Sequence, residues 1–522
     1  MQTPTLRSVA RPPIAILGVP LDNVTTAEAI EFIEQMVASR EPHYLVTANV
    51  DFLVQAREDV ELRRILFDAH LVLCDGTPLV WASRLLGNPL PERVAGADLV
   101  PLLIRVAARR QYRLFLLGAS EESASRAVAK LCATYPELLI VGHYSPPFNQ
   151  LLEMDHEEIK RRILKAQPDL LFVSFGCPKQ EKWIAMHYRA LGVPVVAGVG
   201  ATIDFLAGQV RRAPVWMQRT GTEWIFRLLQ EPRRLFRRYV KDLRVFGWHL
   251  LVQWWHLQRR RRRPQPPCAR APVQAQPECQ WIHLPERLDL AAVQEDVIRL
   301  DQVLADGRHC LLDMAQVQFI DSTGIGSLIR LQKRLRLGGC QLVLLAPSPA
   351  VQRALKLMHL RDFFALAPDV AAAQTLIEAR TRELAALANL PVSAASNGAL
   401  AWQGEVTAAN AEQVWDFTQA HLARLASSRP WRIDLAQVRF IDSTGLGLMV
   451  RLKKLAQQTG APLQFAGLQP AVRNVIHLAR LEEFLLAPSG PEDDGGANPA
   501  QEHVSQPPPS QAPCNSCNDV TN

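Results

Sequence analysis

Polar side chains that could accept or donate a proton stand where two apolar runs of the first half end. Asp75 follows the apolar run 71–74 directly, in the sequence CDGTP. Thr47 and Asn49 stand at the end of another such run, in the sequence TANVDF. A carboxylate within hydrogen-bond reach of a hydroxyl can accept its proton while that hydroxyl attacks another molecule. These residue types indicate proton-transfer chemistry, and the alternative for Asp75 is a turn or helix cap.

Three further turns of the same kind follow along the chain. Lys179 and Gln180 stand in FGCPKQE, Asp204 follows the glycines of GVGATIDFLAG, and Gly118 stands in LLGAS. A glycine turn that opens a helix can direct backbone N–H groups at a phosphate. Each signal alone is weak, because such turns are common in proteins without any bound ligand. All of them fall at one predicted edge of a sheet, which favours a shared site.

The elements that position these residues alternate between short apolar runs and longer amphipathic stretches over residues 14–200. This alternation predicts an α/β fold with a Rossmann-like parallel sheet covered by helices on both faces. Ligands of such sheets bind outside the carboxyl ends of the strands. A chain of 522 residues also exceeds one compact core, so we expect several domains.

One ordered series of motifs in the first half resembles a known family. The motifs are TANVDF, CDGTP, RVAGADL, LFLLGAS, FVSFGCPKQEKWI, GVGATIDFLAG and RAPVWMQRTGTEWIFRLLQEPRRLFRRY. Over about residues 14–250 the chain is similar to the WecG/TagA/CpsF glycosyltransferases. The resemblance implies an inverting transfer of a sugar from a UDP-sugar to a polyprenyl-diphosphate-linked saccharide, in surface polysaccharide biosynthesis. The donor stays open among N-acetylmannosamine, its uronic acid and glucose.

The same resemblance implies roles for individual residues. Asp75 is the expected general base, with Thr47 and Arg93 as its catalytic companions. For Arg93 the alternative is an ordinary salt bridge. The expected substrate-binding residues are those of the pocket, of the phosphate-facing turns and of the C-terminal appendage: Asn49, Gly118, Lys179, Gln180, Asp204, Arg227, Arg234 and Arg237.

No metal or other cofactor is expected for the transfer. Metal-dependent glycosyltransferases often carry Asp-x-Asp, and no two aspartates stand two apart in residues 1–250. Departure of UDP assisted by arginine is therefore the expected route. Cys74 and Cys177 stand beside the motifs, but we interpret them as buried small hydrophobes, not as nucleophiles.

The positive charge of the chain is concentrated in one segment. Residues 211–263 hold fifteen Lys/Arg and three acids, a balance of +12, while the whole chain carries +7. Apolar residues recur there at helical spacing, and five of the eleven tryptophans fall between Trp216 and Trp255. This pattern predicts a basic arm, residues 211–258, that lies on an anionic membrane surface. The alternatives are packing on its own domain and binding of nucleic acid. A lipid-diphosphate substrate accounts for both the positive charge and the row of apolar residues, so we expect no nucleic acid.

The second half contains an internal repeat. DMAQVQFIDSTGIGSLIRL (313–331) returns as DLAQVRFIDSTGLGLMVRL (434–452), identical at thirteen of nineteen positions with an offset of 121. Both copies resemble the STAS domain, a small α/β fold of anti-anti-sigma factors that binds protein partners. In switchable members the residue after D-S is phosphorylated, which corresponds to Thr323 and Thr444. The alternative is that the motif only caps a helix.

These observations predict five segments: a glycosyltransferase domain with the basic arm (1–258), a proline-rich linker (259–278), STAS domains (279–388 and 398–488) and a disordered tail (489–522). Nine scattered cysteines indicate a reducing compartment, and a lone CNSC in the tail is no zinc site. We expect a cytoplasmic protein, peripheral on the inner face of the cell membrane, whose STAS pair regulates it or binds an unidentified protein. The alternative is a signalling scaffold whose glycosyltransferase half has lost catalysis.

Overall fold

The computed structural model describes most of the chain. The described residues are 11–209, 212–220, 222–261, 279–295, 303, 308–361, 363–387, 392–394, 400–422, 431–459 and 461–486. The predicted tail 489–522 lies outside the described residues, and so do residues 262–278 of the predicted linker. The last helix of the basic arm runs through Arg261, past the predicted boundary at residue 258.

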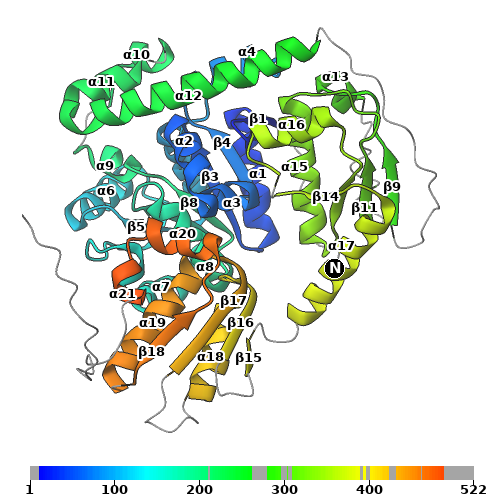
Figure 1. The fold of residues 1–522 in the computed structure, drawn as a ribbon. Helices are drawn as coiled ribbons and strands as arrows, with labels where there is room; N and C mark the ends of the chain where they lie inside the picture. Colours follow the sequence, from blue (N-terminus) through cyan, green and yellow to red (C-terminus); the bar gives the residue numbers. More distant parts are fainter. Residues whose placement is uncertain are drawn as a thin grey trace, which may run out of the picture.

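A six-stranded parallel sheet forms the centre of the N-terminal domain (Figure 1). Its strands, in spatial order, are β4 (Leu71–Cys74), β3 (His43–Ala48), β8 (Val195–Gly198), β7 (Leu170–Ser174), β5 (Arg113–Gly118) and β6 (Leu139–Tyr144). All the pairings between these strands are parallel. The predicted α/β class with a parallel sheet is confirmed, and the carboxyl ends of all six strands meet at one edge.

Helices cover both faces of this sheet because alternate strand residues are apolar on both sides. In β7, Leu171 and Val173 join one hydrophobic cluster, and Leu170 and Phe172 join the other. The first cluster receives α2 (Val50–Glu58), α3 (Val60–Asp68), α4 (Thr77–Leu86), α7 (His156–Ala166) and α8 (Lys179–Leu191). The second receives α1 (Thr26–Ser39), α5 (Gly96–Arg110), α6 (Glu121–Thr134) and α9 (Thr202–Ala207). Burial on both faces is typical of parallel sheets.

The basic arm consists of three helices that cross the top of the domain in Figure 1. They are α10 (Val215–Thr220), α11 (Glu223–Gln230) and α12 (Pro232–Arg261). The long helix α12 packs on α2 and α4, and Arg238 of α12 forms an ion pair of 2.6 Å with Asp51 of α2. The arm is therefore part of the domain surface. No helix among the described residues is both long and apolar enough to cross a membrane.

Two small α/β domains follow, as predicted from the repeat. In the first repeat domain the strands are β9 (Cys279–His283), β10 (Arg287–Leu288), β11 (His309–Asp313), β12 (Phe319–Ile320), β13 (Leu342–Leu345) and β14 (Ala365–Ala367). Its helices are α13 (Leu290–Gln294), α15 (Ser322–Leu337), α16 (Pro349–Leu357) and α17 (Val370–Leu387).

The second repeat domain has a sheet of β15 (Val392–Ala394), β16 (Leu400–Val406), β17 (Trp431–Ile441) and β18 (Leu463–Ala466). Its helices are α18 (Ala411–Leu422), α19 (Ser443–Thr459), α20 (Pro470–Leu478) and α21 (Glu482–Leu486). In both repeat domains the D-S-T-G turn joins a strand to a long helix, α15 or α19. These turns face the N-terminal domain.

Gly118 is the last residue of β5, next to β7 in the sheet. Its φ angle is +95°, and a Cβ atom there would lie 2.4 Å from the carbonyl oxygen of Ser174 on β7. An L-residue would thus meet both an unfavourable backbone conformation and a steric clash. Glycine at this position is required by the close approach of β5 and β7.

Gly118→Ala should therefore lower the free energy of unfolding by roughly 2–4 kcal/mol. Gly192→Ala is the matched control, because Gly192 also has a positive φ of +60° but nothing lies within 4 Å of its Cβ position. The control should cost roughly 1 kcal/mol, from the backbone conformation alone. Urea unfolding of both variants measures the difference, and equal losses would contradict the steric argument.

Candidate active site

Asp75 lies directly after β4, at the carboxyl edge of the sheet. Its backbone N–H donates to the carbonyl of Ala48 at the end of β3, at 2.8 Å. Its carboxylate Oδ2 accepts from the N–H of Gly96 at 3.4 Å. Gly96 is the first residue of α5, so the carboxylate stands at the positive end of a fifteen-residue helix.

Thr47 and Asn49 lie beside this carboxylate. A Cβ atom on Gly96 would stand 3.2 Å from the Thr47 hydroxyl oxygen, and one on Gly76 would stand 3.8 Å from the Asn49 Cβ. Glycine at these two positions lets the ends of β3 and β4 approach the start of α5. Asn49 also caps α2, because its Oδ1 accepts from the N–H of Phe52 at 3.3 Å. Three of the predicted site residues thus gather at one place.

An arginine cluster faces Asp75 from the basic arm and from the loop before α5. Arg93 donates to Asp98 at 2.9 Å and to Glu223 at 3.2 Å. Arg227 pairs with Glu223 at 2.9 Å, and Arg212 pairs with Asp98 at 2.6 Å. Arg93 therefore does form salt bridges, and these bridges hold the arm against the edge of the sheet.

Burial raises the pKa of Asp75 to about 6. The positive charges of Arg93 and Arg227 and the Gly96 N–H oppose this rise, and the negative charge of Glu223 adds to it. A carboxylate with a pKa near neutrality is ionised at physiological pH and still basic enough to take a proton from a hydroxyl. Perturbed carboxyl groups of this kind concentrate at functional sites.

Asp75→Asn should make the protein more stable at pH 8. The folded-state pKa lies above the ordinary value of 3.8, so ionisation of Asp75 destabilises the fold as the pH rises through about 6. The amide avoids this cost, about 3 kcal/mol for a shift of about two pKa units. The melting temperature of the variant should exceed that of the wild type at pH 8 and approach it at pH 4. An Asp75→Asn variant that is less stable at pH 8 would show that Asp75 is a structural residue.

Gln180 lies in the same edge but is turned into the protein. Its side chain is buried, and its Oε1 accepts from the N–H groups of Gly176 and Gly200, both at 3.2 Å. Its Nε2 donates to Glu181 at 2.7 Å. The side chain therefore ties the loop after β7 to the loop after β8. In this arrangement Gln180 positions the two loops, and its carbonyl oxygen is fully used by their backbone N–H groups.

Glu181 of the same FGCPKQE turn is a further buried carboxyl at this edge. Burial raises its pKa to about 7, and its Oε2 has no hydrogen-bond partner among the described residues. Glu181 lies in the first turn of α8, and its carboxyl is about half protonated at neutral pH.

The other predicted substrate-binding residues are not all gathered around Asp75. Asp204 stands in the first turn of α9, partly exposed, at the same edge. Lys179 reaches away from Asp75 and donates to the carbonyl of Asn149. Gly118 serves the β5–β7 contact described above, and Arg237 is exposed on α12. The side chain of Arg234 lies outside the described residues.

Sequence reasoning missed the acidic partners of the arginines. Glu223 stands 130 positions from Arg93, and only the folded chain brings the two together, whereas Asp98 stands five positions from Arg93. A signal was present, because Glu223 and Asp242 are two of the three acids in an otherwise cationic segment. Both are buried, as expected for acids that join the segment to its domain.

Two cysteines beside the site have poor nucleophile character. Burial raises the pKa of Cys74 to about 12, and burial together with nearby carboxylates raises that of Cys177 further. Both thiols are therefore protonated at neutral pH. Within the part of the chain that the structure describes, no three His, Cys, Asp or Glu side chains stand together as metal ligands would. The metal-independent route stays a prediction.

The two D-S-T-G turns have the geometry of helix caps. Asp321 accepts from the N–H groups of Thr323 and Gly324 at 2.8 and 2.9 Å, and Asp442 does the same in the second repeat domain. The hydroxyl oxygens of Thr323 and Thr444 are buried and have no hydrogen-bond partner among the described residues. A kinase could reach these hydroxyls only after the surrounding contacts had opened.

An open parallel sheet with a desolvated carboxylate beside an arginine cluster at its carboxyl edge is the arrangement of an α/β group-transfer enzyme. Residues 14–260 match the profile of the glycosyl transferase WecG/TagA/CpsF family. Residues 270–373 match the STAS domain, and residues 390–487 match the profile described as Mlab, STAS domain. The chain belongs to the WecG/TagA/CpsF family of glycosyltransferases and carries two STAS domains after its transferase domain.

Curated relatives support the same assignment. Proteins of Staphylococcus aureus strains MW2 and NCTC 8325 are both described as N-acetylglucosaminyldiphosphoundecaprenol N-acetyl-beta-D-mannosaminyltransferase. Each is 31% identical to this chain over 235 residues, which are 45% of this chain and 90% of the relative. Almost the whole of each relative is thus represented here.

Proposed function

We propose that this enzyme transfers N-acetylmannosamine from its UDP derivative to a saccharide on a polyprenyl diphosphate. The names of the relatives support this donor sugar and a diphosphoundecaprenol-linked acceptor. The observation that carries the proposal is the Asp75 carboxylate, which lies at the sheet edge between the start of α5 and cations of the basic arm. N-acetylmannosamine is the first choice among the three donors that the sequence left open.

Asp75 acts as the general base in the proposed reaction. The acceptor hydroxyl gives its proton to the Asp75 carboxylate, and its oxygen forms a bond to the anomeric carbon from the side opposite UDP. The bond between that carbon and the UDP oxygen breaks, and UDP leaves with the electron pair, so the configuration inverts. In this proposal the Thr47 hydroxyl, which lies beside Gly96 at the start of α5, orients the acceptor.

The arginine cluster supplies the charge that the leaving diphosphate needs. The guanidinium groups of Arg93, Arg212 and Arg227 face the carboxylates of Asp98 and Glu223. Once Asp75 is protonated, three positive groups face two negative ones. An excess of positive charge then coincides with the departure of the diphosphate, which is the condition for electrostatic stabilisation. No metal or other cofactor is part of this proposal.

Asp75→Asn should lower the rate of transfer at least about a hundredfold, since general-base catalysis typically contributes that much. The assay supplies UDP-N-acetylmannosamine and a short-chain lipid diphosphate carrying N-acetylglucosamine, and it measures release of UDP. Asp416→Asn, an exposed change in the second repeat domain, is the matched control and should keep the wild-type rate. An Asp75→Asn enzyme that works within about twofold of the wild type would remove Asp75 from the mechanism.

The pH dependence provides a second test. Asp75 must be ionised to accept a proton, so kcat/KM should fall as the pH drops below about 6. Arg227→Gln removes a cation that lowers the pKa of Asp75, and the acid limb should therefore move to higher pH. Arg105→Gln, on the exposed side of α5, should leave the limb in place. An unchanged limb in the Arg227→Gln variant would contradict the assignment of this limb to Asp75.

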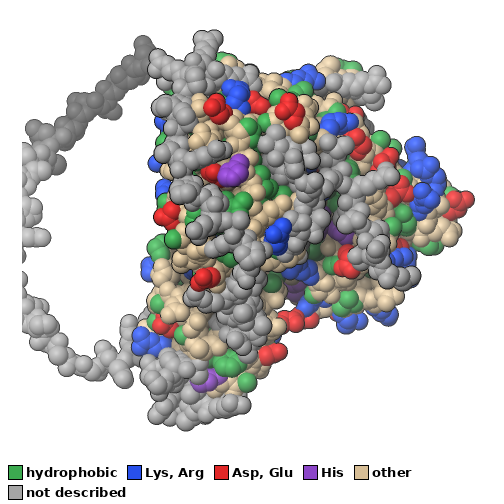
Figure 2. Space-filling view, turned by 90° about the vertical axis from the view of Figure 1, so that its right-hand side faces the viewer, with side chains coloured by type: hydrophobic (Ala, Val, Ile, Leu, Met, Phe, Trp, Pro, Cys, Tyr) green, Lys and Arg blue, Asp and Glu red, His purple; other side chains and the backbone are tan. Residues whose placement is uncertain are grey.

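The surface of the basic arm supports a position on the cytoplasmic face of the cell membrane. Large apolar side chains are exposed on the arm and on α4 beneath it: Trp81, Leu85, Trp216, Trp224, Leu229, Phe236, Val240, Leu243, Trp248, Leu251 and Trp255. Those of α12 recur along one side of the helix, flanked by exposed basic residues such as Arg233 and Lys241. By contrast, the side of the molecule in Figure 2 shows charges of both signs interspersed with apolar side chains. An apolar row beside basic residues fits an anionic lipid surface, where the polyprenyl acceptor resides.

Leu243→Glu should weaken binding to vesicles that contain phosphatidylglycerol by about tenfold or more. The leucine is 72% exposed, so the change removes apolar area worth roughly 1.5–3 kcal/mol when buried in lipid. Leu164→Glu is the control, because Leu164 is 49% exposed on α7, outside the arm. Sedimentation with vesicles measures both, and equal binding by the two variants would contradict the proposed membrane surface.

A further inference from the structure

Helix α3 of the transferase domain lies between the two repeat domains and contacts both of them (Figure 1). Its remaining side, with Leu62 and Leu66, is buried in the core of the transferase domain. Nine residues of helix therefore serve three neighbours. This arrangement makes α3 a common attachment point for the two STAS domains.

The second repeat domain attaches to α3 through the serine of its D-S-T-G turn. The backbone N–H of Ser443 donates to Glu61 Oε1 at 2.6 Å, and the Ser443 hydroxyl donates to Glu61 Oε2 at 2.8 Å. One helical turn further along α3, Arg64 pairs with Glu405 at 3.2 Å. The Arg64 guanidinium also lies 3.6 Å from the centre of the Phe440 ring. Both members of the Ser443–Glu61 pair are buried.

The first repeat domain contacts α3 from another side. Arg63 donates to the carbonyl of His359 at 3.0 Å, and the rings of Phe67 and Phe363 are 4.4 Å apart. Lys333 on α15 donates to the carbonyl of Ala69, just after α3. Polar and aromatic contacts thus join this domain to the same helix.

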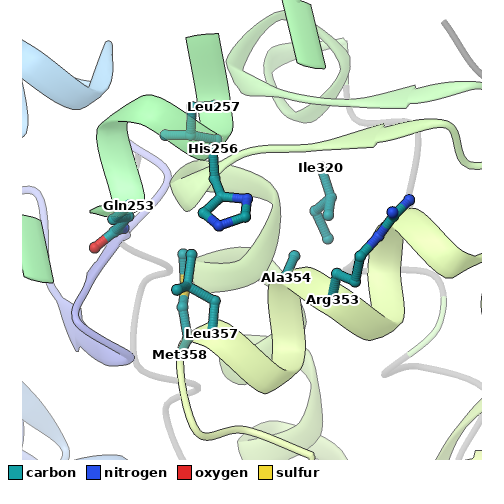
Figure 3. Close-up of a pocket in the computed structure, with 8 residues that line it drawn as sticks. All are labelled: Gln253, His256, Leu257, Ile320, Arg353, Ala354, Leu357 and Met358. Atoms are coloured by element: carbon teal, nitrogen blue, oxygen red, sulfur yellow. The ribbon is translucent and has the colours of Figure 1, made fainter. Parts of the chain in front are cut away.

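The serine of the first D-S-T-G turn also contacts the transferase domain. Ser322, which is equivalent to Ser443 in the repeat, accepts from the buried Gln253 amide of α12 at 2.9 Å. The same amide group donates to Ala15 and accepts from the N–H of Leu17 in the first hairpin of the chain. Next to Gln253, a small pocket separates the end of α12 from Ile320 and Met358 of the first repeat domain (Figure 3).

We propose that the partner of both STAS domains is the transferase domain of the same chain, bound through the serine of each D-S-T-G turn, and that a negative charge at Ser443 releases the second domain. The two turns carry identical residues but meet different groups. Ser443 meets the Glu61 carboxylate, whereas Ser322 meets a neutral amide that can donate to an anion. An anion at Ser443 would face a like charge in a site with little water, which disfavours the docked state.

The contacts of the two D-S-T-G turns are connected to helices that carry the candidate active site. Glu61 pairs with Lys182 of α8 at 2.9 Å, and Lys182 pairs with Asp59, the cap of α3, at 2.8 Å. Lys182 stands two residues from Gln180, which ties the loops after β7 and β8 together. On the side of the first repeat domain, Gln253 lies on α12, the long helix of the basic arm. Release of either repeat domain would therefore remove a contact from an element that supports the site.

A charge exchange at the exposed part of the contact tests the proposal in the full chain. Arg64 and Glu405 are 39% and 38% exposed, so each tolerates substitution. Arg64→Glu and Glu405→Arg should each speed amide hydrogen exchange in α3 and in the first turn of α19 by about tenfold, equivalent to about 1.4 kcal/mol. The double variant, in which the pair is reversed, should regain most of the protection. Arg105→Glu on α5 is the matched control and should leave both segments protected.

The charge at the second turn is tested in the same experiment. Ser443→Asp should speed exchange in the same two segments, whereas Ser393→Asp, an exposed change in the same domain, should not. Glu61→Gln added to Ser443→Asp should restore protection, because the Gln amide can donate to the new carboxylate.

Unchanged exchange in the Arg64 and Glu405 single variants, or no recovery in their double variant, would overturn the docking proposal. Failure of Glu61→Gln to rescue a folded Ser443→Asp chain would overturn the charge release.

If Ser443→Asp unfolds the second domain, seen as loss of protection throughout α19, then Glu61→Lys replaces it as the probe. Glu61→Lys should release the domain when Ser443 is native and should hold it when combined with Ser443→Asp, and any other result would overturn the proposal. Exchange is measured without substrate, so a failure here is distinct from a failure of the proposed transfer reaction.

Discussion

The proposed chemistry depends on one carboxylate, that of Asp75, whose position and pKa are set by its neighbours. Asp75 stands at the carboxyl edge of the sheet, where β3, β4 and the start of α5 meet. Burial raises its pKa. The Gly96 N–H lowers this pKa, and so do Arg93 of the α4–α5 loop and Arg227 of the basic arm. The site is therefore complete only when the arm is in place.

The basic arm connects this site to two surfaces. On one side its apolar and cationic residues are exposed, as the proposed position on a lipid surface requires. On the other side Arg238, Phe246 and Gln253 attach α12 to the transferase domain and to the first repeat domain. A helix with such different sides explains why the sequence segment is both strongly basic and rich in tryptophan. It also places the STAS domains away from the apolar row of the arm.

Much of the fold and part of the site could be predicted from the sequence. The alternation of apolar runs and amphipathic stretches gave the parallel sheet, and the carboxyl ends of parallel strands necessarily share one edge. This rule was sufficient to bring Asp75, Thr47 and Asn49 together. The exact repeat of D-S-T-G likewise gave two copies of one small domain. These features are local or periodic, and a single chain displays them directly.

The remaining features depend on tertiary contacts that no local pattern contains. Glu223 reaches Arg93 across 130 positions, and Ser443 reaches Glu61 across 382. Gln180 belongs to the motif that suggested a pocket residue, yet its amide is used by the backbone of two loops. Whether a polar side chain at a strand end turns outward or inward is decided by the neighbouring loops, which the sequence does not place.

Direct titration of Asp75 tests the central claim most sharply. Difference infrared spectroscopy of the wild type against Asp75→Asn isolates the carboxyl band of this residue as a function of pH. The account predicts one carboxyl group that titrates near pH 6 in the wild type and is missing from the variant. A band that titrates near the ordinary value of 3.8 would show a solvated carboxylate, and it would contradict the buried base on which the mechanism rests.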